Sequence, residues 1–181
     1  METLTLYHGS IYDFESIDLS FGKPFKDFGI GFYTSASRMH AVSLAKRNKI
    51  IEEVRRNVGV RYAEAVQVWL YEYHFPLDAL ERLNVKEFNQ ADREWMQFVT
   101  MNRRSRRREH QYDMVIGPTA NDKTNTIIQI YLSGGYGAVG SERAINTLLA
   151  LIETDKLPGQ YFFGSEKAIG YLTLHKKEQV A

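Results

Sequence analysis

The sequence lacks cysteine altogether, any long apolar run and any marked excess of charge. The absence of cysteine excludes a disulfide framework, a thiolate zinc site and a cysteine nucleophile, and it fits a reducing compartment. No segment approaches the roughly 18 apolar residues of a membrane-spanning helix, and the first residues do not resemble a signal peptide. With a net charge of +1, no overall attraction to nucleic acid or membrane is expected. We therefore expect a cytoplasmic protein without a membrane partner.

The length of 181 residues fits one domain, spanning 1–181, with a sizeable core. Alternating apolar, β-branched and aromatic residues predict strands, at 3–8, 31–34, 62–75, 112–116, 160–163 and 171–175. Capping residues followed by helical apolar spacing predict helices, beginning at 35 or 37, at 92, at 121 or 122, at 141 and at 165. The mixture lacks regular βαβ alternation. It favours an α+β fold, with a largely antiparallel sheet core flanked by helices.

The first candidate site is Tyr7-His8-Gly9-Ser10, at the end of the first predicted strand. A strand end places a histidine at the rim of a sheet, and a following glycine allows a ligand to approach the backbone closely. His8 could then hydrogen-bond a ribose hydroxyl, while the backbone of Gly9 could pair with a carboxamide. The alternative is a histidine packed into a turn, and the residues by themselves leave both interpretations open.

The second candidate site is the segment DFGIGFYTS, residues 27–35. Two glycines before an aromatic pair suit a loop that folds under a ligand, with the ring of Tyr33 as a stacking wall. The segment is not a Rossmann fingerprint, because the third glycine is missing and the glycines precede a strand. It is not a phosphate-binding P-loop either, since no Gly-Lys-Ser/Thr follows. A plain turn leading into a core strand is the open alternative.

These two segments, followed by a helix with small residues at Ala41 and Ala45, resemble the first two motifs of the His-Tyr-Glu branch of ADP-ribosyltransferases. The wider pattern adds ADREWMQFVTMNR, YDMVIGPTAND and the late QYFF strand, and runs from about Leu4 to about Leu172. Together these features are similar to a bacterial DUF3990-type domain of that superfamily. The resemblance implies an ADP-ribosyltransferase-like fold with a split antiparallel sheet.

The resemblance also implies an activity. It suggests an NAD-dependent mono-ADP-ribosyltransferase that modifies a macromolecular acceptor, protein or nucleic acid, without a metal. Such a protein would serve as the toxin of a toxin–antitoxin or phage-defence system, with a small antitoxin protein as a possible partner. His8 would hold the adenosine ribose of NAD⁺, Gly9 the nicotinamide carboxamide, and Tyr33 would stack on the nicotinamide ring. Other small residues of the two motifs are expected near the ligand, namely Ser10, Gly31 and Ser35.

The third motif departs from the transferase pattern. Its strand begins with glutamate in the family, whereas the corresponding residue here is Gln160. Glutamine hydrogen-bonds a hydroxyl but carries no charge, so it would stabilise an oxocarbenium-like transition state less than a carboxylate does. With His8, Tyr33 and Gln160 as catalytic residues, single transfer is expected. A degenerate domain that binds NAD or ADP-ribose without transfer is the alternative, as is a Gln160 that is merely an ordinary polar residue at a strand start.

Five arginines fall within six positions, at Arg103, Arg104, Arg106, Arg107 and Arg108. Such a run could contact a pyrophosphate, a nucleic acid or an acidic partner, or it could be a solvated helix end. It supports a third hypothesis, a nucleic-acid-binding module. We expect Arg103 and Arg106 to contact the acceptor or partner, and Asp92 either to do the same or to cap a helix. The five histidines lack HxxxH spacing, so no metal site is expected.

Overall fold

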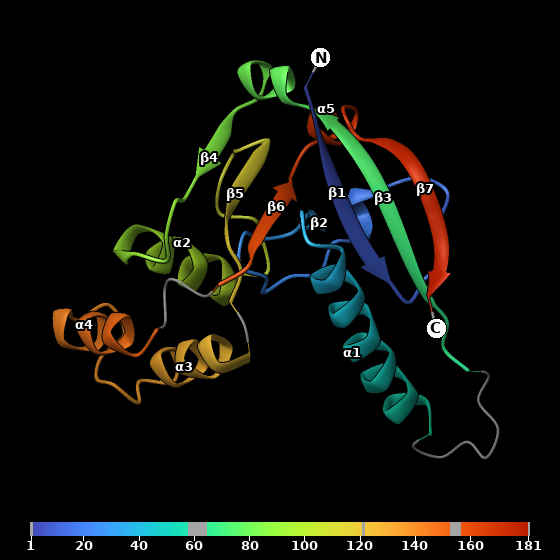
Figure 1. Ribbon diagram of the computed structural model, residues 1–181. Helices are drawn as coiled ribbons and strands as arrows, with labels where there is room; N and C mark the ends of the chain where they lie inside the picture. The colour runs from blue at the N-terminus through green and yellow to red at the C-terminus, as the bar shows by residue number, and fades with distance from the viewer. Residues whose placement is uncertain (1, 58–64, 121, 153–156, 181) are drawn as a thin grey trace.

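The computed structural model describes residues 2–57, 65–120, 122–152 and 157–180. It contains two β-sheets with helices around them (Figure 1). One sheet has three strands in the order β1-β3-β7, and the other has four in the order β2-β6-β5-β4. All neighbouring strands are antiparallel except β4 and β5, which are parallel. The α+β class and the division of the β-structure into two largely antiparallel sheets are thus confirmed.

The three-stranded sheet consists of β1 (Thr3–Ser10), β3 (Val68–Pro76) and β7 (Thr173–Val180). Helix α1 (Arg38–Asn57) packs against β1 and β3. The hydroxyl of Ser37 accepts a hydrogen bond from the His40 amide at 3.2 Å and so caps the helix. The pairing of β1 with β3 and the packing of α1 hold the first motif, near the end of β1, in place.

The four-stranded sheet consists of β2 (Phe32–Thr34), β6 (Gly159–Phe163), β5 (Met114–Pro118) and β4 (Val85–Glu87). Helices α2 (Arg93–Arg104), α3 (Asp122–Leu132) and α4 (Glu142–Leu151) cover it, and the short α5 (Glu166–Ile169) follows β6. Two 3-10 helices, η1 (Leu19–Phe21) and η2 (Leu77–Arg82), complete the elements.

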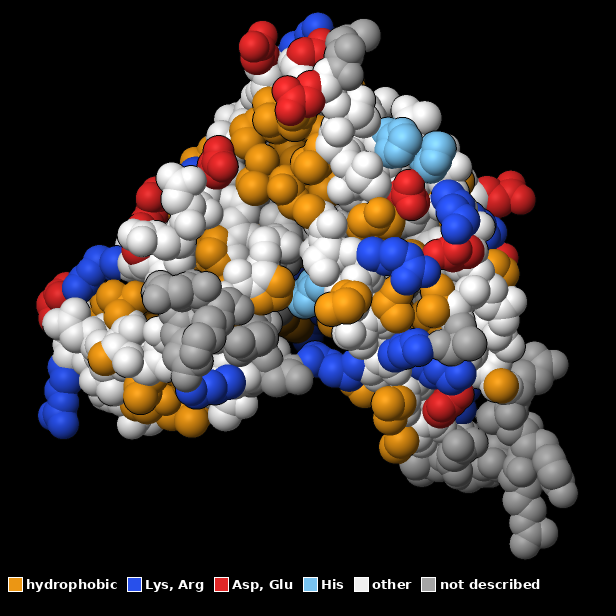
Figure 2. All heavy atoms as spheres, viewed as in Figure 1, with side chains coloured by type: hydrophobic (Ala, Val, Ile, Leu, Met, Phe, Trp, Pro, Cys, Tyr) orange, Lys and Arg blue, Asp and Glu red, His pale blue; other side chains and the backbone are white. Residues whose placement is uncertain are grey.

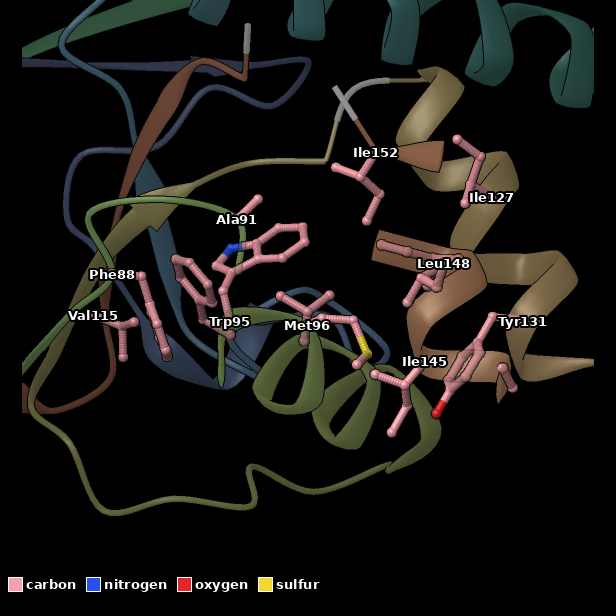
Figure 3. Packing of buried hydrophobic residues seen from close by; sticks show 14 of the residues in the cluster. Phe88, Ala91, Trp95, Met96, Val115, Ile127, Tyr131, Ile145, Leu148 and Ile152 are labelled. Atoms are coloured by element: carbon pink, nitrogen blue, oxygen red, sulfur yellow. The ribbon is translucent and has the colours of Figure 1, made fainter. Parts of the chain in front are cut away.

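The larger hydrophobic core lies between this sheet and helices α2, α3 and α4 (Figure 3). Trp95 is at its centre, fully buried, and its indole Nε1 donates to the Pro118 carbonyl at 2.9 Å. The side chains around it come from all three helices, and include Met96, Ile127, Tyr131, Ile145 and Leu148. Because this core fixes α2 against β5, it also fixes the residues that α2 presents to the second motif.

The two sheets are joined between Tyr7, within β1, and Ser35, the residue after β2. The Tyr7 amide donates to the Ser35 carbonyl at 2.7 Å, and the Ser35 amide donates back to the Tyr7 carbonyl at 2.9 Å. This isolated bridge brings the first motif beside the second, although the two are separated in sequence by the whole segment that contains η1.

Most predicted elements are present, but some bounds differ. The strand expected over 62–75 begins at Val68, since 65–67 belong to no helix or strand and 62–64 lie outside the described residues. The last strand extends to Val180, since its polar residues pair with β3 at the sheet edge. Residue 121, one of two alternative starts for a helix, also lies outside the described residues. Within the described ranges, no helix is long and apolar enough to cross a membrane.

Candidate functional site

His8 and Tyr33 are in direct contact. The Nδ1 atom of His8 lies 2.7 Å from the backbone carbonyl oxygen of Tyr33. A carbonyl can only accept, so the proton of the neutral imidazole belongs on Nδ1, and Nε2 is left as a hydrogen-bond acceptor. The ring stacks on Phe32 at a centroid distance of 4.4 Å and meets Phe14 edge-on at 5.8 Å. The imidazole is therefore fixed in both tautomer and orientation.

The pKa of His8 is lowered to about 4, because burial disfavours the charged form more than the hydrogen bond to Tyr33 favours it. At neutral pH the side chain is an uncharged acceptor. It suits a hydroxyl group of a ligand rather than a phosphate, which would prefer a cation.

A neutral, partly buried histidine makes the stability depend on pH. The folded-state pKa lies below the unfolded value of 6.5, so the contribution is complete above pH 6.5 and is lost as the pH falls toward 4. We expect the wild type to lose roughly 2 kcal/mol between pH 7 and pH 4.5 through this group. In His8→Gln that part of the loss should disappear. Urea denaturation at both pH values measures it, and equal losses in the two proteins would contradict the assignment.

Tyr33 is held at both ends. Its hydroxyl donates to the Gly29 carbonyl at 2.6 Å and accepts from the Phe28 amide at 3.1 Å, while its ring meets Phe162 edge-on at 5.1 Å. Burial raises the pKa of the phenol well above 10, so it stays protonated. The ring is thus a fixed, uncharged and partly exposed surface beside His8.

The glycines of both motifs serve close packing. A β-carbon on Gly9 would lie 2.1 Å from the Ala41 carbonyl oxygen of α1, and one on Gly31 would lie 2.3 Å from the Phe162 ring. The sequence predicts a ligand in the free space at Gly9, whereas helix α1 fills that space. The ligand contacts expected of Gly9 and Gly31 remain predictions that concern their backbone atoms only.

The two serines near these glycines also have intramolecular partners. The Ser10 hydroxyl accepts from the Tyr12 amide at 2.9 Å. The Ser35 hydroxyl donates to the Gly159 carbonyl at 3.2 Å and accepts from the Ser37 amide at 3.1 Å. Both side chains are buried; Ser35 connects β1, β2 and β6, while Ser10 holds the loop that follows β1. A direct contact of either serine with a ligand stays a prediction.

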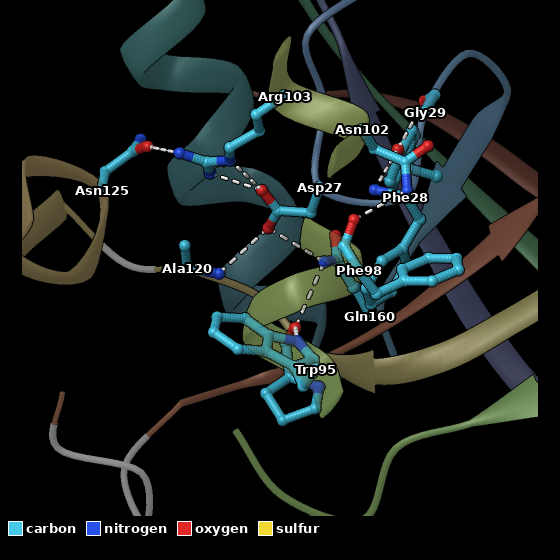
Figure 4. Close-up of polar contacts among 12 residues, drawn as sticks. Asp27, Phe28, Gly29, Trp95, Phe98, Asn102, Arg103, Ala120, Asn125 and Gln160 are labelled. Carbon is cyan, nitrogen blue, oxygen red and sulfur yellow. Dashed lines mark hydrogen bonds and ion pairs between the residues drawn. The ribbon is translucent and has the colours of Figure 1, made fainter. Parts of the chain in front are cut away.

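Asp27, the first residue of the second motif, is the centre of a buried polar network (Figure 4). Its Oδ1 accepts from Arg103 Nε at 2.6 Å, and its Oδ2 accepts from the Ala120 amide at 3.1 Å and from Gln160 Nε2 at 3.2 Å. Arg103 also contacts Asn125 on α3. The side chains of Asp27 and Arg103 are only 7% and 8% exposed. The network connects the loop before β2 with α2, α3 and β6.

Gln160 belongs to this network. Its amide donates to Asp27 and also to the Pro118 carbonyl at 3.3 Å. A glutamate in the same place would set a second carboxylate against that of Asp27, with no proton to donate, so the network itself gives a reason for glutamine. The resemblance predicts that Gln160 faces the ligand, whereas its amide nitrogen donates to two protein partners.

The arginine run is divided by the fold. Arg103 lies in the interior as the partner of Asp27, so it is not the surface contact that the sequence predicted. The Arg108 guanidinium donates to the Gly164 carbonyl. The remaining three, Arg104, Arg106 and Arg107, line a pocket of about 740 Å³. The same pocket is bordered by residues of α2 and by the glycine-rich segment before α4.

Asp92 is the N-cap of α2, which confirms the helix-cap alternative of the two predicted for it. Its side chain accepts from the Trp95 amide at 3.0 Å. Asp27 is the residue that sequence reasoning missed, although it opens the second motif. The sequence signal for Asp27 was an acidic residue among glycines and phenylalanines. Its partner Arg103 is 76 positions away, so the local sequence did not indicate an ion pair.

On the face seen in Figure 2 the molecule is hollowed between α1 and the pair α3 and α4, with a histidine and a basic side chain at the margin. The Arg-lined pocket does not include His8 or Tyr33. A dinucleotide at the two motifs and an anion at the arginines would therefore occupy different places. The site at the two motifs thus combines a neutral hydrogen-bond acceptor, His8, with a fixed aromatic ring, Tyr33. The buried Asp27–Arg103 ion pair lies next to them in the fold.

Comparison with known proteins places the chain in a family. The family model of DUF3990, described as a protein of unknown function, matches residues 4–174. No curated protein and no solved structure matches the chain. The match covers nearly the whole sequence and both motifs that build the contact of His8 with Tyr33. The chain therefore belongs to the DUF3990 family.

Proposed function

We propose that this protein is an NAD-dependent mono-ADP-ribosyltransferase of ADP-ribosyltransferase-like fold, which transfers ADP-ribose to a macromolecular acceptor. The observation that carries the proposal is the contact of His8 with Tyr33, made where the Tyr7–Ser35 bridge joins the two sheets. The two residues that the resemblance pairs in sequence lie together in space, at 2.7 Å. The toxin role, and the small antitoxin that would accompany it, are part of the same proposal.

The chemistry of the two side chains suits the proposal. NAD⁺ supplies the ADP-ribosyl group, with nicotinamide as the leaving group. His8, neutral and with Nε2 free to accept, can bind a ribose hydroxyl. The Tyr33 ring, fixed through its hydroxyl, can stack on a planar ring without losing further conformational freedom.

The glutamine at position 160 bears on whether the domain transfers ADP-ribose or only binds NAD. Since its amide supports Asp27, it acts on the site through the position of β6 beside β2. A site without a carboxylate at this point stabilises a cationic transition state less, so slow single transfer is expected. A domain that binds NAD or ADP-ribose without transfer would share the His8–Tyr33 contact and differ in releasing no nicotinamide.

The test is the variant Tyr33→Ala beside Tyr33→Phe. Stacking of a base on an aromatic side chain contributes about 1–3 kcal/mol, so Tyr33→Ala should weaken NAD⁺ binding by at least about fivefold. Tyr33→Phe keeps the stacking ring and loses only the hydroxyl that fixes it, so it should weaken binding clearly less than Tyr33→Ala does. Calorimetric titration with NAD⁺ measures binding, and labelled NAD⁺ with cell lysate measures nicotinamide release and acceptor labelling. Digestion with protease or nuclease then identifies the acceptor class.

The outcomes separate the hypotheses. Binding without nicotinamide release in any lysate would support the degenerate domain. Absence of NAD⁺ binding in the folded wild type, or full turnover in Tyr33→Ala, would refute the transferase proposal. Circular dichroism of both variants shows whether the loss reflects the site or the fold.

Nucleic-acid binding is a second candidate, favoured by the three arginines that line one pocket. Arg104, Arg106 and Arg107 are grouped there with Gln97 and Thr100, so guanidinium and polar groups face the same space. Phosphate contacts would make the affinity for an oligonucleotide fall steeply with salt. Such binding, unchanged in Tyr33→Ala and lost in Arg106→Ala combined with Arg107→Ala, would favour this function.

A further inference from the structure

We propose that Glu72, His74 and His175 form a binding site for one divalent transition-metal ion of the zinc type. Each offers one ligand atom, and these atoms all lie within 4.8 Å of one another. The Oε1 atom of Glu72 is 3.8 Å from His74 Nε2 and 3.9 Å from His175 Nε2. The residues come from two neighbouring strands, β3 and β7.

The fold assembles the site through a β-bulge. Glu72 and His74 are two positions apart on β3, so their side chains share one face of the sheet. Along β7 the register shifts: Tyr73 pairs with Leu174 but Glu72 pairs with Lys176. His175 is therefore the extra residue, opposite the step from Glu72 to Tyr73, and its ligand atom lies within reach of those of Glu72 and His74.

The donor set matches zinc chemistry. Two imidazole nitrogens and one carboxylate oxygen are common zinc ligands, at about 2.0–2.2 Å from the ion. In a tetrahedral site, neighbouring ligand atoms are then about 3.3 Å apart. The observed 3.8 and 3.9 Å between Glu72 and the two imidazole nitrogens require a closure of about half an ångström, and all three ligand atoms already lie within 4.8 Å of one another. The imidazole rings are stacked nearly parallel, with an interplanar angle of 17° and centroids 4.2 Å apart, so the rings must also rotate about their side-chain bonds until both lone pairs point at the ion.

The site is accessible, and two cations near Glu72 have another partner. The side chains of Glu72, His74 and His175 are 24%, 37% and 56% exposed. Lys176, which faces Glu72 in register, is paired with Glu178 at 2.5 Å. Arg38, whose charge also interacts with that of Glu72, is paired with the same Glu178 carboxylate at 2.6 Å. Three protein ligands leave the fourth position for water, so an ion can enter from solvent without displacing a protein cation.

An ion here would join β7 to β3 at a position where β7 forms the edge of the three-stranded sheet. A ligand that binds the folded state alone raises the melting temperature. In the β1–β3 register His8 pairs with Tyr71, whereas Tyr7 pairs with Glu72. The metal ligands therefore lie on the opposite face of the sheet from His8, and the inference is independent of the proposed activity.

The test is titration of the full chain, without a polyhistidine tag, with zinc chloride in a calorimeter, supported by the visible absorption of added Co²⁺. We expect one ion per chain and a rise in melting temperature. Loss of a partner that merely orients a metal ligand costs about 10–100-fold in affinity. Each of His74→Ala, His175→Ala and Glu72→Gln should therefore weaken binding by at least about tenfold.

His40→Ala is the matched control, because it removes a histidine from α1 and none from the site. Its affinity for zinc should equal that of the wild type. Wild-type protein without a one-to-one zinc complex would overturn the proposal, as would equal affinity in the three ligand variants. The three substitutions are at exposed or partly exposed positions of two strands. If one variant fails to fold, the other two still test the zinc site.

Discussion

Replacing Asp27 by asparagine is expected to lower the free energy of unfolding by about 3–5 kcal/mol. The carboxylate accepts hydrogen bonds from Arg103, Ala120 and Gln160, and both members of the ion pair are buried. In the variant the Arg103 guanidinium would keep its charge without a counter-charge in a low-dielectric interior. Since asparagine has similar size, the loss would report charge and hydrogen bonding rather than a cavity.

Urea denaturation of Asp27→Asn measures the effect. The matched control is Glu142→Gln, which removes an exposed carboxylate from its contact with Arg93 and should cost far less than Asp27→Asn, because solvent screens the pair. A double replacement, Asp27→Leu with Arg103→Met, should recover much of the stability, because apolar residues of similar volume remove both charges together. Equal small losses in Asp27→Asn and Glu142→Gln would show that the interior pair does not hold the site.

Replacing Gly9 by alanine is expected to cost about 3 kcal/mol, at or above the upper end of the range for overpacked cores. The added β-carbon would lie 2.1 Å from the Ala41 carbonyl oxygen and 2.8 Å from the Ala45 β-carbon. The first obstacle is backbone of α1, which cannot move aside as a flexible side chain could. Either α1 or the end of β1 must shift, and His8 is the adjacent residue.

The control for this prediction is Gly159→Ala. Gly159 begins β6, and a β-carbon there would meet nothing within 4 Å. Its stability should stay within about 0.5 kcal/mol of the wild type. Thermal unfolding compares the two, and NAD⁺ titration of whatever folded Gly9→Ala protein remains shows whether His8 has moved. A Gly9→Ala protein as stable as Gly159→Ala would contradict the close packing of α1.

Local sequence patterns predicted most elements because their causes are local. Asp92, Ser141 and Ser165 cap helices through hydrogen bonds to amides three residues ahead, so the signal and its structure lie within one turn. Alternation similarly marked β1 and the core of β3. The short strand β4 escaped prediction because its three residues carry almost no pattern and depend on their parallel pairing with β5.

The candidate site was predicted only in part. His8 and Tyr33 were recognised from the order of two motifs, and the structure brings them together. The roles of Gly9, Gln160 and Arg103 could not be read in the same way. Each is determined by a partner distant in sequence: α1 for Gly9, and Asp27 for the other two.

By itself, the sequence determined the family pattern, the α+β class, the capped helices and the identity of the residues at both motifs. Tertiary structure alone decided which arginines are interior and that Glu72, His74 and His175 share one face of a sheet. It also decided that Gly9 and Gly31 have no room for a β-carbon. The physical reason is that burial, charge pairing and strand register arise from contacts between distant segments. A one-residue bulge in β7 is enough to place His175 between two residues about a hundred positions earlier, and no local pattern encodes that.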